Sequence, residues 1–174
     1  MGEILFRTRL SENLFKGLSP WMQKLPGGLI HVNVVGCALF AAISGSSAAT
    51  VATVGKMSIP ELRKRKYPEK ILLGSLAGSG TLGLLIPPSI ILIIYGVTVQ
   101  ESIAKLFIAG IFPGIMIALI FMSYVIIWSL TNHKIMPKIY ETSSFLDKIK
   151  KSKQLLPVIL LILGVIGSIY TGVA

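Results

Sequence analysis

The sequence predicts an all-α integral membrane protein, and three observations support that fold class. First, the 174 residues are 53% hydrophobic and 14% charged, with a mean hydropathy of +0.77, whereas a soluble domain is about 25% charged. Second, residues 71–100, 106–132 and 154–174 contain no Asp, Glu, Lys or Arg, and roughly 20 apolar residues suffice for a helix to cross the bilayer. Third, clusters of glycine, serine and proline interrupt two apolar regions, which predicts helices that break at membrane depth.

The basic residues are confined to a few short segments. Of 17 Lys and Arg, 16 fall into three groups: Arg7, Arg9, Lys16 and Lys24; Lys56, Arg63, Lys64, Arg65, Lys66 and Lys70; and Lys134, Lys138, Lys148, Lys150, Lys151 and Lys153. Only Lys105 lies elsewhere. Because short cytoplasmic loops collect Lys and Arg, all three groups are expected to face the cytoplasm and its anionic lipid. The basic residues that give the net charge of +10 are therefore expected to interact with the lipid bilayer, and nucleic acid is not expected as a partner.

Two further features exclude other classes of protein. The one cysteine, Cys37, excludes an intramolecular disulfide framework and a cysteine metal cluster. Residues 1–25 mix charges among their apolar residues and lack the compact apolar core of a signal peptide. We therefore take this segment as an amphipathic arm on the membrane surface, with Leu14, Leu18 and Trp21 on its apolar face.

The stretch AAISGSSAATVATVG, at residues 41–55, predicts a re-entrant hairpin. Basic groups flank the apolar region 25–54 at both ends, so a single crossing would leave one of them outside. If both groups are cytoplasmic, two half-helices at residues 28–44 and 48–56 meet at the Ser-Gly-Ser-Ser tip and return to the same side. The alternative is one kinked spanning helix followed by an inverted loop.

The stretch GSLAGSGTLGLLIPPSII, at residues 74–91, predicts a discontinuous helix. Proline removes a backbone donor, and Pro88 also disfavours helical geometry at Pro87. We expect the helix to unwind near residues 80–83. A continuous, closely packed helix is the alternative, because Gly74 and Gly78 form a small-xxx-small pair, as Gly110 and Gly114 do in the next helix.

These patterns divide the chain into seven segments. They are an interfacial arm helix (1–27), the re-entrant hairpin (28–57), a basic cytoplasmic connection (58–70), the discontinuous transmembrane helix (71–100), a transmembrane helix (101–132), a cytoplasmic loop (133–153) and a last transmembrane helix (154–174). Within the connection, Ser58 and Glu61 have the spacing of a capping box and predict the start of a short separate helix.

Breaks in membrane helices predict a binding site for ions. Carbonyl groups at the end of a helix carry partial negative charge, and those of residues 42–45 could join the hydroxyls of Ser44, Ser46, Ser47 and Thr81 around a hard cation. Paired discontinuous helices are typical of secondary transporters. Because the apolar spans hold no Asp or Glu to carry protons, Na⁺ is the expected coupling ion. His31 is the one group at depth that could titrate, but a packed, hydrogen-bonded histidine is the more frequent case.

Half-helix N-termini carry partial positive charge and could face an anionic substrate. The residues that we expect to face it are Ser47, Thr50, Pro87, Pro88 and Ser89. No catalytic residue is expected. An intramembrane serine protease built on Ser44 would need a histidine base within reach, and His31 and His133 are poorly placed for that role.

The stretches LPGGLIHVNVVGCALFAAISGSSAATVATVG, GTLGLLIPPSIILIIYG and SIAKLFIAGIFPGI together resemble the large membrane subunit, the DctM-type permease, of tripartite ATP-independent periplasmic (TRAP) transporters. The resemblance covers about the whole chain. It implies a sodium-coupled, elevator-type importer of organic acids such as dicarboxylates or sialic acid, in the bacterial inner membrane. It also implies a small membrane subunit and a periplasmic binding protein as partners, and a sodium site at Ser44, Gly45, Ser46, Ser47, Gly80, Thr81 and Gly83.

Two departures from the family accompany this resemblance. Many relatives have an Asp shortly after the hairpin serines, where this chain has Thr50. Family members are also more than twice as long and carry a second, inverted repeat, so this chain resembles one repeat of a larger permease. A non-transporting membrane scaffold subunit and a hairpin-containing anion symporter of another family are the alternative functions.

Overall fold

The described residues, 10–137 and 152–170 of a computed structural model, are built from helices without any strand. The helices are α2 (Leu10–Met22), α3 (Ile30–Ser44), α4 (Ser47–Lys64), α5 (Glu69–Gly80), α6 (Leu82–Leu85), α7 (Ile90–Val99), α8 (Ile103–Thr131), the 3₁₀ turn η1 (Lys153–Leu155) and α10 (Leu156–Tyr170). The predicted all-α class is therefore confirmed for this part of the chain. The stretches Glu69–Val99 and Ile103–Thr131, 31 and 29 residues long, are long and apolar enough to cross a membrane.

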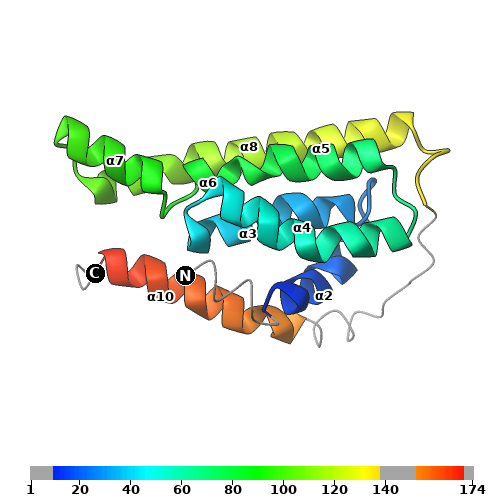
Figure 1. Ribbon diagram of the computed structural model, residues 1–174, viewed down its shortest axis with the longest axis horizontal. Helices are drawn as coiled ribbons and strands as arrows, with labels where there is room; N and C mark the ends of the chain where they lie inside the picture. The colour runs from blue at the N-terminus through cyan, green and yellow to red at the C-terminus, as the bar shows by residue number, and fades with distance from the viewer. Residues whose placement is uncertain (1–9, 138–151, 171–174) are drawn as a thin grey trace.

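Helix α3 lies at the centre of the molecule, between α2, α4, α5 and α8 (Figure 1). It is apolar on all sides, as expected of a helix surrounded by others, and most of its residues are buried. Phe40 of α3, Leu14 of α2, Leu72 of α5 and Val125 of α8 are core side chains with 2% exposure or less. The core thus joins the predicted hairpin, the broken helix and the arm in one packed body.

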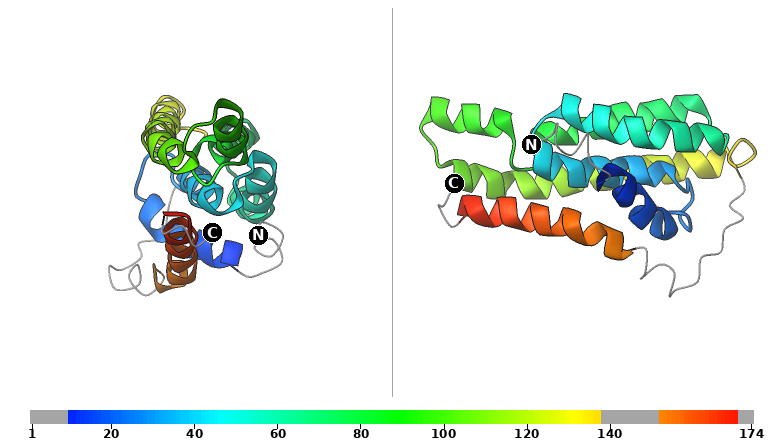
Figure 2. Two further views of the ribbon diagram at one scale, coloured as in Figure 1. Left: turned by 90° about the vertical axis from the view of Figure 1, so that its left-hand side faces the viewer. Right: turned by 60° about the horizontal axis from the view of Figure 1, so that its bottom comes forward.

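Helix α2 is amphipathic, as predicted, in the part that the structure describes. Leu14 and Leu18 are buried, whereas Lys16 is exposed. The last turn of α2 meets the start of the last helix: Trp21 is 43% exposed, and its indole nitrogen donates a hydrogen bond of 2.8 Å to the Ser152 hydroxyl. Figure 2 shows α10 running along the same side of the bundle as α2.

Two antiparallel helices, α3 and α4, form a hairpin that reverses at Gly45 and Ser46 (Figure 1), and its re-entry into the membrane from one side stays a prediction. The separate basic helix expected from Ser58 is wrong, because α4 continues without interruption to Lys64. Ser58 is fully buried in the middle of α4, and its hydroxyl has no hydrogen-bond partner among the described residues. Pro60 is accommodated inside this helix.

The predicted interruption of the second element is also present, but it lies further along the chain. Thr81 keeps nearly helical backbone angles (φ −64°, ψ −20°), so the expected unwinding at residues 80–83 is only a brief irregularity. The extended backbone begins at Ile86 (ψ 123°) and lasts to Ser89 (ψ 129°). Ile86 precedes Pro87, and a residue before proline is forced towards extended geometry, which explains why the prolines rather than the glycines set the break.

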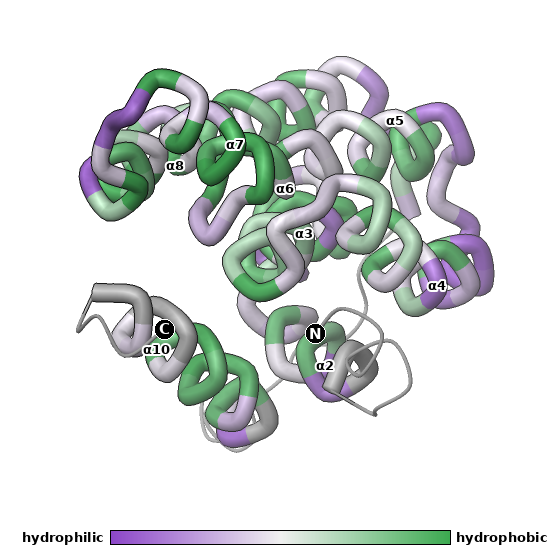
Figure 3. The backbone as a smooth tube through the Cα atoms, turned by 60° about the vertical axis from the view of Figure 1, so that its left-hand side comes forward, coloured by the Kyte–Doolittle hydropathy of each residue, from purple (hydrophilic) through white to green (hydrophobic). Residues whose placement is uncertain are grey.

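Charged residues gather at two opposite ends of the bundle. The end of α4 and the start of α5 carry Arg63, Lys64, Lys66 and Lys70, and this region is hydrophilic in Figure 3. The turn between α7 and α8, with Gln100 and Glu101, forms the other hydrophilic end. Between them α7 and α8 expose large apolar side chains, as expected of surfaces that meet lipid or another membrane helix.

Candidate functional site

The turn between α3 and α4 is held by hydroxyl groups of its own residues. Gly45 adopts left-handed angles (φ 60°, ψ 14°) at the end of α3, and Ser46 is the N-cap of α4, accepting a long hydrogen bond (3.5 Å) from Ala49 N–H. The hydroxyls of Ser44 and Thr50 are 2.8 Å apart, and Thr50 also donates to the Ser46 carbonyl at 2.8 Å. The turn is therefore fixed by side chains from both helices.

The turn is seated against the break between α6 and α7. A Cβ atom placed on Gly45 would lie 2.5 Å from the carbonyl oxygen of Pro88, and the Ile90 N–H donates to the Gly45 carbonyl at 3.4 Å. A Cβ on Gly83 would lie 2.8 Å from the Ser47 nitrogen and 2.9 Å from the Ser46 carbonyl. These glycines allow the backbones of the two interrupted helices to touch.

Six of the seven residues predicted to bind sodium lie at this contact. Ser44, Gly45, Ser46 and Ser47 form the turn, and Gly80 and Gly83 face it: a Cβ on Gly80 would collide with Val51 in the first turns of α4. Thr81 differs, because its side chain is exposed and its hydroxyl donates to the Gly78 carbonyl at 2.7 Å.

The residues predicted to face the substrate divide into two groups. Ser47 and Pro88 are partly exposed, beside the contact between the two breaks. Thr50, Pro87 and Ser89 are buried, and the Ser89 hydroxyl donates to the Leu84 carbonyl. Contact of these five residues with a substrate stays a prediction.

The electrostatics of the site come from helix ends rather than from charged side chains. The last carbonyl groups of α3 and the first N–H groups of α4 lie on either side of Gly45, so partial negative and partial positive charge are adjacent. Carbonyl and hydroxyl oxygens are ligands for hard cations. Among the described residues no group of three His, Cys, Asp or Glu side chains could hold a metal ion.

A row of buried polar side chains between α3 and α5 was not predicted as part of the site. The Asn33 amide donates to the Ser75 hydroxyl at 3.0 Å, and the Ser79 hydroxyl donates to the Asn33 carbonyl at 3.4 Å. The signal in the sequence was the serine pair at i and i+4, which places both on one face of α5. These contacts fix α5 on α3 and so align the two breaks.

His31 is fully buried, and its Nε2 lies 2.7 Å from the carbonyl oxygen of Pro26. This is the packed, hydrogen-bonded arrangement expected for a lone histidine. The nearest hydroxyl partner of Ser44 is Thr50, and among the described residues no histidine bonds to it. The part of the site that the structure describes therefore lacks the base that a serine nucleophile requires.

Comparison with known proteins identifies the family. The family model "Tripartite ATP-independent periplasmic transporter, DctM component" matches residues 1–174. The C4-dicarboxylate TRAP transporter large permease protein DctM of Pseudomonas aeruginosa is 40% identical over 146 residues, which are 84% of this chain and 34% of that protein. The ectoine/5-hydroxyectoine TRAP transporter large permease protein UehC of Ruegeria pomeroyi is 34% identical over 176 residues, covering 98% of this chain and 39% of that protein.

A third relative, the sialic acid TRAP transporter permease protein SiaT of Haemophilus influenzae, is 41% identical over 114 residues, covering 66% of this chain and 18% of that protein. The chain thus spans about two fifths or less of the length of these relatives. The family is one of membrane transport proteins rather than enzymes. Because its model matches the whole sequence, the chain belongs to the DctM component family of tripartite ATP-independent periplasmic transporters.

Proposed function

We propose that this chain is part of a permease of the bacterial inner membrane that imports organic acids together with Na⁺. The observation that carries the proposal is the contact of two helix interruptions, with Gly45 against Pro88 and Gly83 against Ser46. Irregular backbone at membrane depth persists only where protein or a polar cavity satisfies it. Two such interruptions in contact supply oxygens for a cation and helix N-termini for an anion.

The sodium site lies at residues 44–47 together with Gly80, Thr81 and Gly83. The carbonyl oxygens at the end of α3 and the hydroxyl of Ser44 are the nearest candidate ligands, and Gly80 and Gly83 let α5 and α6 approach them. Thr81 is included because it lies between Gly80 and Gly83 in the sequence. Its hydroxyl is exposed, so a substitution there tests the proposed sodium site with little effect on packing.

The substrate lies on the side of the contact marked by Ser47 and Pro88, while Thr50, Pro87 and Ser89 shape the backbone around it. Relatives named for C4-dicarboxylates, for sialic acid and for ectoine share this part of the sequence. We therefore propose that the region shared by these relatives forms the ion site and that other parts of the permease select the substrate. Dicarboxylates or sialic-acid-like compounds are the substrate class proposed here.

The transport cycle is an elevator movement, in which the hairpin and the broken helix move as one unit against a fixed part of the permease. The hydrogen bonds of Asn33 with Ser75 and Ser79 support such a unit because they join α3 to α5. The word tripartite in the family description supports two partners, a small membrane subunit and a periplasmic binding protein. A non-transporting scaffold, the remaining alternative, would need no sodium.

The test is sodium-dependent uptake by the permease that contains this chain, reconstituted with its partner subunits. Ser44→Ala and Thr81→Val each remove one neutral oxygen, which is worth about 1–3 kcal/mol, or roughly fivefold to 150-fold in the sodium concentration for half-maximal uptake. Thr98→Val is the matched control, since Thr98 is an exposed helical threonine whose hydroxyl also bonds to its own helix. If a well-folded variant that carries both Ser44→Ala and Thr81→Val needs the same sodium concentration, the proposed sodium site is wrong.

A further inference from the structure

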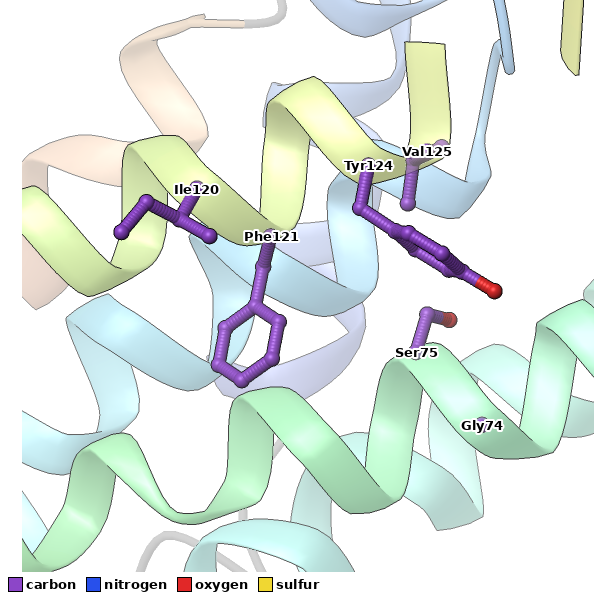
Figure 4. Close-up of a pocket in the computed structure, with 6 residues that line it drawn as sticks. All are labelled: Gly74, Ser75, Ile120, Phe121, Tyr124 and Val125. Atoms are coloured by element: carbon purple, nitrogen blue, oxygen red, sulfur yellow. The ribbon is translucent and has the colours of Figure 1, made fainter. Parts of the chain in front are cut away.

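A groove of about 290 Å³ lies between α5 and α8, away from the contact of the two breaks. Figure 4 shows its lining, which consists of Gly74, Ser75, Ile120, Phe121, Tyr124 and Val125. No atom lies within 4 Å of a Cβ placed on Gly74, whereas one on Gly78 would lie 3.1 Å from the Phe121 ring. The groove is therefore open at Gly74 and closed one turn later, at Gly78.

The chemistry of the groove favours an apolar, chain-like occupant. Its two polar groups are the Ser75 hydroxyl, already bonded to Asn33 and to the Leu72 carbonyl, and the Tyr124 hydroxyl on a side chain that is 58% exposed. A second membrane helix would pack on a seam of small residues. Here the seam ends after one turn, because Phe121 already fills the space at Gly78.

Positive charge lies at one end of the groove. Lys70 precedes Gly74 by four residues, so it lies on the same face of α5, about 6 Å nearer the basic end. Lys134 follows the end of α8 at the same end of the bundle. Both lysines are exposed and neither pairs with a described carboxylate, whereas Glu69 is 2.8 Å from Arg63. This arrangement is complementary to a phosphate attached to an apolar chain.

We propose that the groove binds one anionic phospholipid, with an acyl chain along Gly74 and Phe121 and its phosphate beside Lys70 and Lys134. The lipid would fill the space that Gly74 leaves open and brace α5 against α8. The proposal is independent of the sodium site, because none of the groove residues belongs to the contact of the two breaks.

The first test uses native mass spectrometry of the complete permease taken from nanodiscs of phosphatidylglycerol or phosphatidylcholine. We expect retention of phosphatidylglycerol in preference to phosphatidylcholine. One lysine near an anionic phosphate contributes roughly fivefold, and Lys70→Gln with Lys134→Gln should weaken retention roughly 25-fold. Lys105→Gln is the control, because Lys105 lies at the opposite end of α8. Equal retention in the double variant and the control would overturn the proposal.

The second test separates a lipid from a protein occupant. Gly74→Leu should fill the groove and abolish retention, while Ala77→Leu, on the same helix but outside the groove, should not. A photo-crosslinking residue at Tyr124 should form phospholipid adducts in membranes. Adducts with a segment of the permease or with another subunit would show that protein covers the groove and would overturn the lipid assignment.

Discussion

Gly45 sets the geometry of the turn on which the proposed site depends. Alanine does not fit there, because φ is 60° and an added Cβ would lie 2.5 Å from the Pro88 carbonyl oxygen. Left-handed angles alone cost a non-glycine residue about 1–2 kcal/mol. We expect Gly45→Ala to lower the melting temperature of the complete permease, measured by intrinsic fluorescence.

Gly164→Ala is the control for this prediction. Gly164 is in α10 with no atom within 4 Å of an added Cβ, so alanine there should be neutral or slightly stabilising. Equal melting temperatures for the two variants would mean that the turn adjusts without strain.

At the scale of residues, the sequence predicted which groups gather but not how each is oriented. The Ser-Gly-Ser-Ser turn was identifiable because basic groups flank it on both sides. The partner of Ser44 is Thr50 rather than Thr81, because the side of α5 that meets the hairpin carries Gly80 while Thr81 is exposed. Which face a helix presents to its neighbour is set by packing, and in α5 only the pair Ser75 and Ser79 marks a face, since its apolar residues lie on all sides.

At the scale of elements, the connection after α4 closes the base of the hairpin. The Leu29 N–H at the start of α3 donates to the Tyr67 hydroxyl at 3.1 Å, and burial raises the pKa of Tyr67, which stays neutral. Tyr67→Phe leaves a buried donor unpaired, which costs about 1–3 kcal/mol. We expect a lower melting temperature and faster proteolysis between α4 and α5.

The matched variant is Tyr95→Phe, because Tyr95 is a 54% exposed tyrosine on α7. It should leave both measurements unchanged. If Tyr67→Phe behaves in the same way, water must reach the start of α3 and the hairpin base is not sealed.

The helical elements were largely predictable, and their boundaries were not. Charge-free spans and the hairpin followed from composition and from the distribution of Lys and Arg. The capping-box interpretation of Ser58 was wrong because Pro60 is tolerated inside α4, where the flanking apolar contacts of Val54 and Leu62 keep the helix continuous. The close packing expected of Gly110 and Gly114 is present, since they lie against Leu85 and Ile86 at the break.

At the scale of the whole molecule, the two charged ends predict the orientation in the membrane. Single cysteines placed at Arg63 and Gln100 in a Cys37→Ser background should react from the cytoplasm and from outside, respectively, because Arg63 is at the basic end and Gln100 at the other. Positions near Ser11 and Lys148 should also be cytoplasmic, the latter lying outside the described residues. Labelling of position 63 from outside would contradict a re-entrant hairpin.

A second prediction at this scale is that the 174-residue chain does not transport by itself. It spans about a third of the Pseudomonas relative, and only 17% of the most apolar window of α8 is buried. Backbone polar groups at a helix break that no other part of the protein covers are costly in lipid. Purified and reconstituted with an inward sodium gradient, it should show no uptake. Sodium-driven uptake without other subunits would imply that copies of the chain pair to complete the site.

The length of α3 has a consequence for how the proposed sodium site would sense membrane voltage. Its 15 residues measure about 22 Å, whereas the hydrocarbon layer is about 30 Å thick. In the proposed orientation a cation at Gly45 has therefore entered about a quarter of the electric field from outside. One charge gains about 2.3 kcal/mol across 100 mV, so at the proposed site roughly 0.6 kcal/mol would act on capture of the ion and the remaining three-quarters on its passage to the cytoplasm.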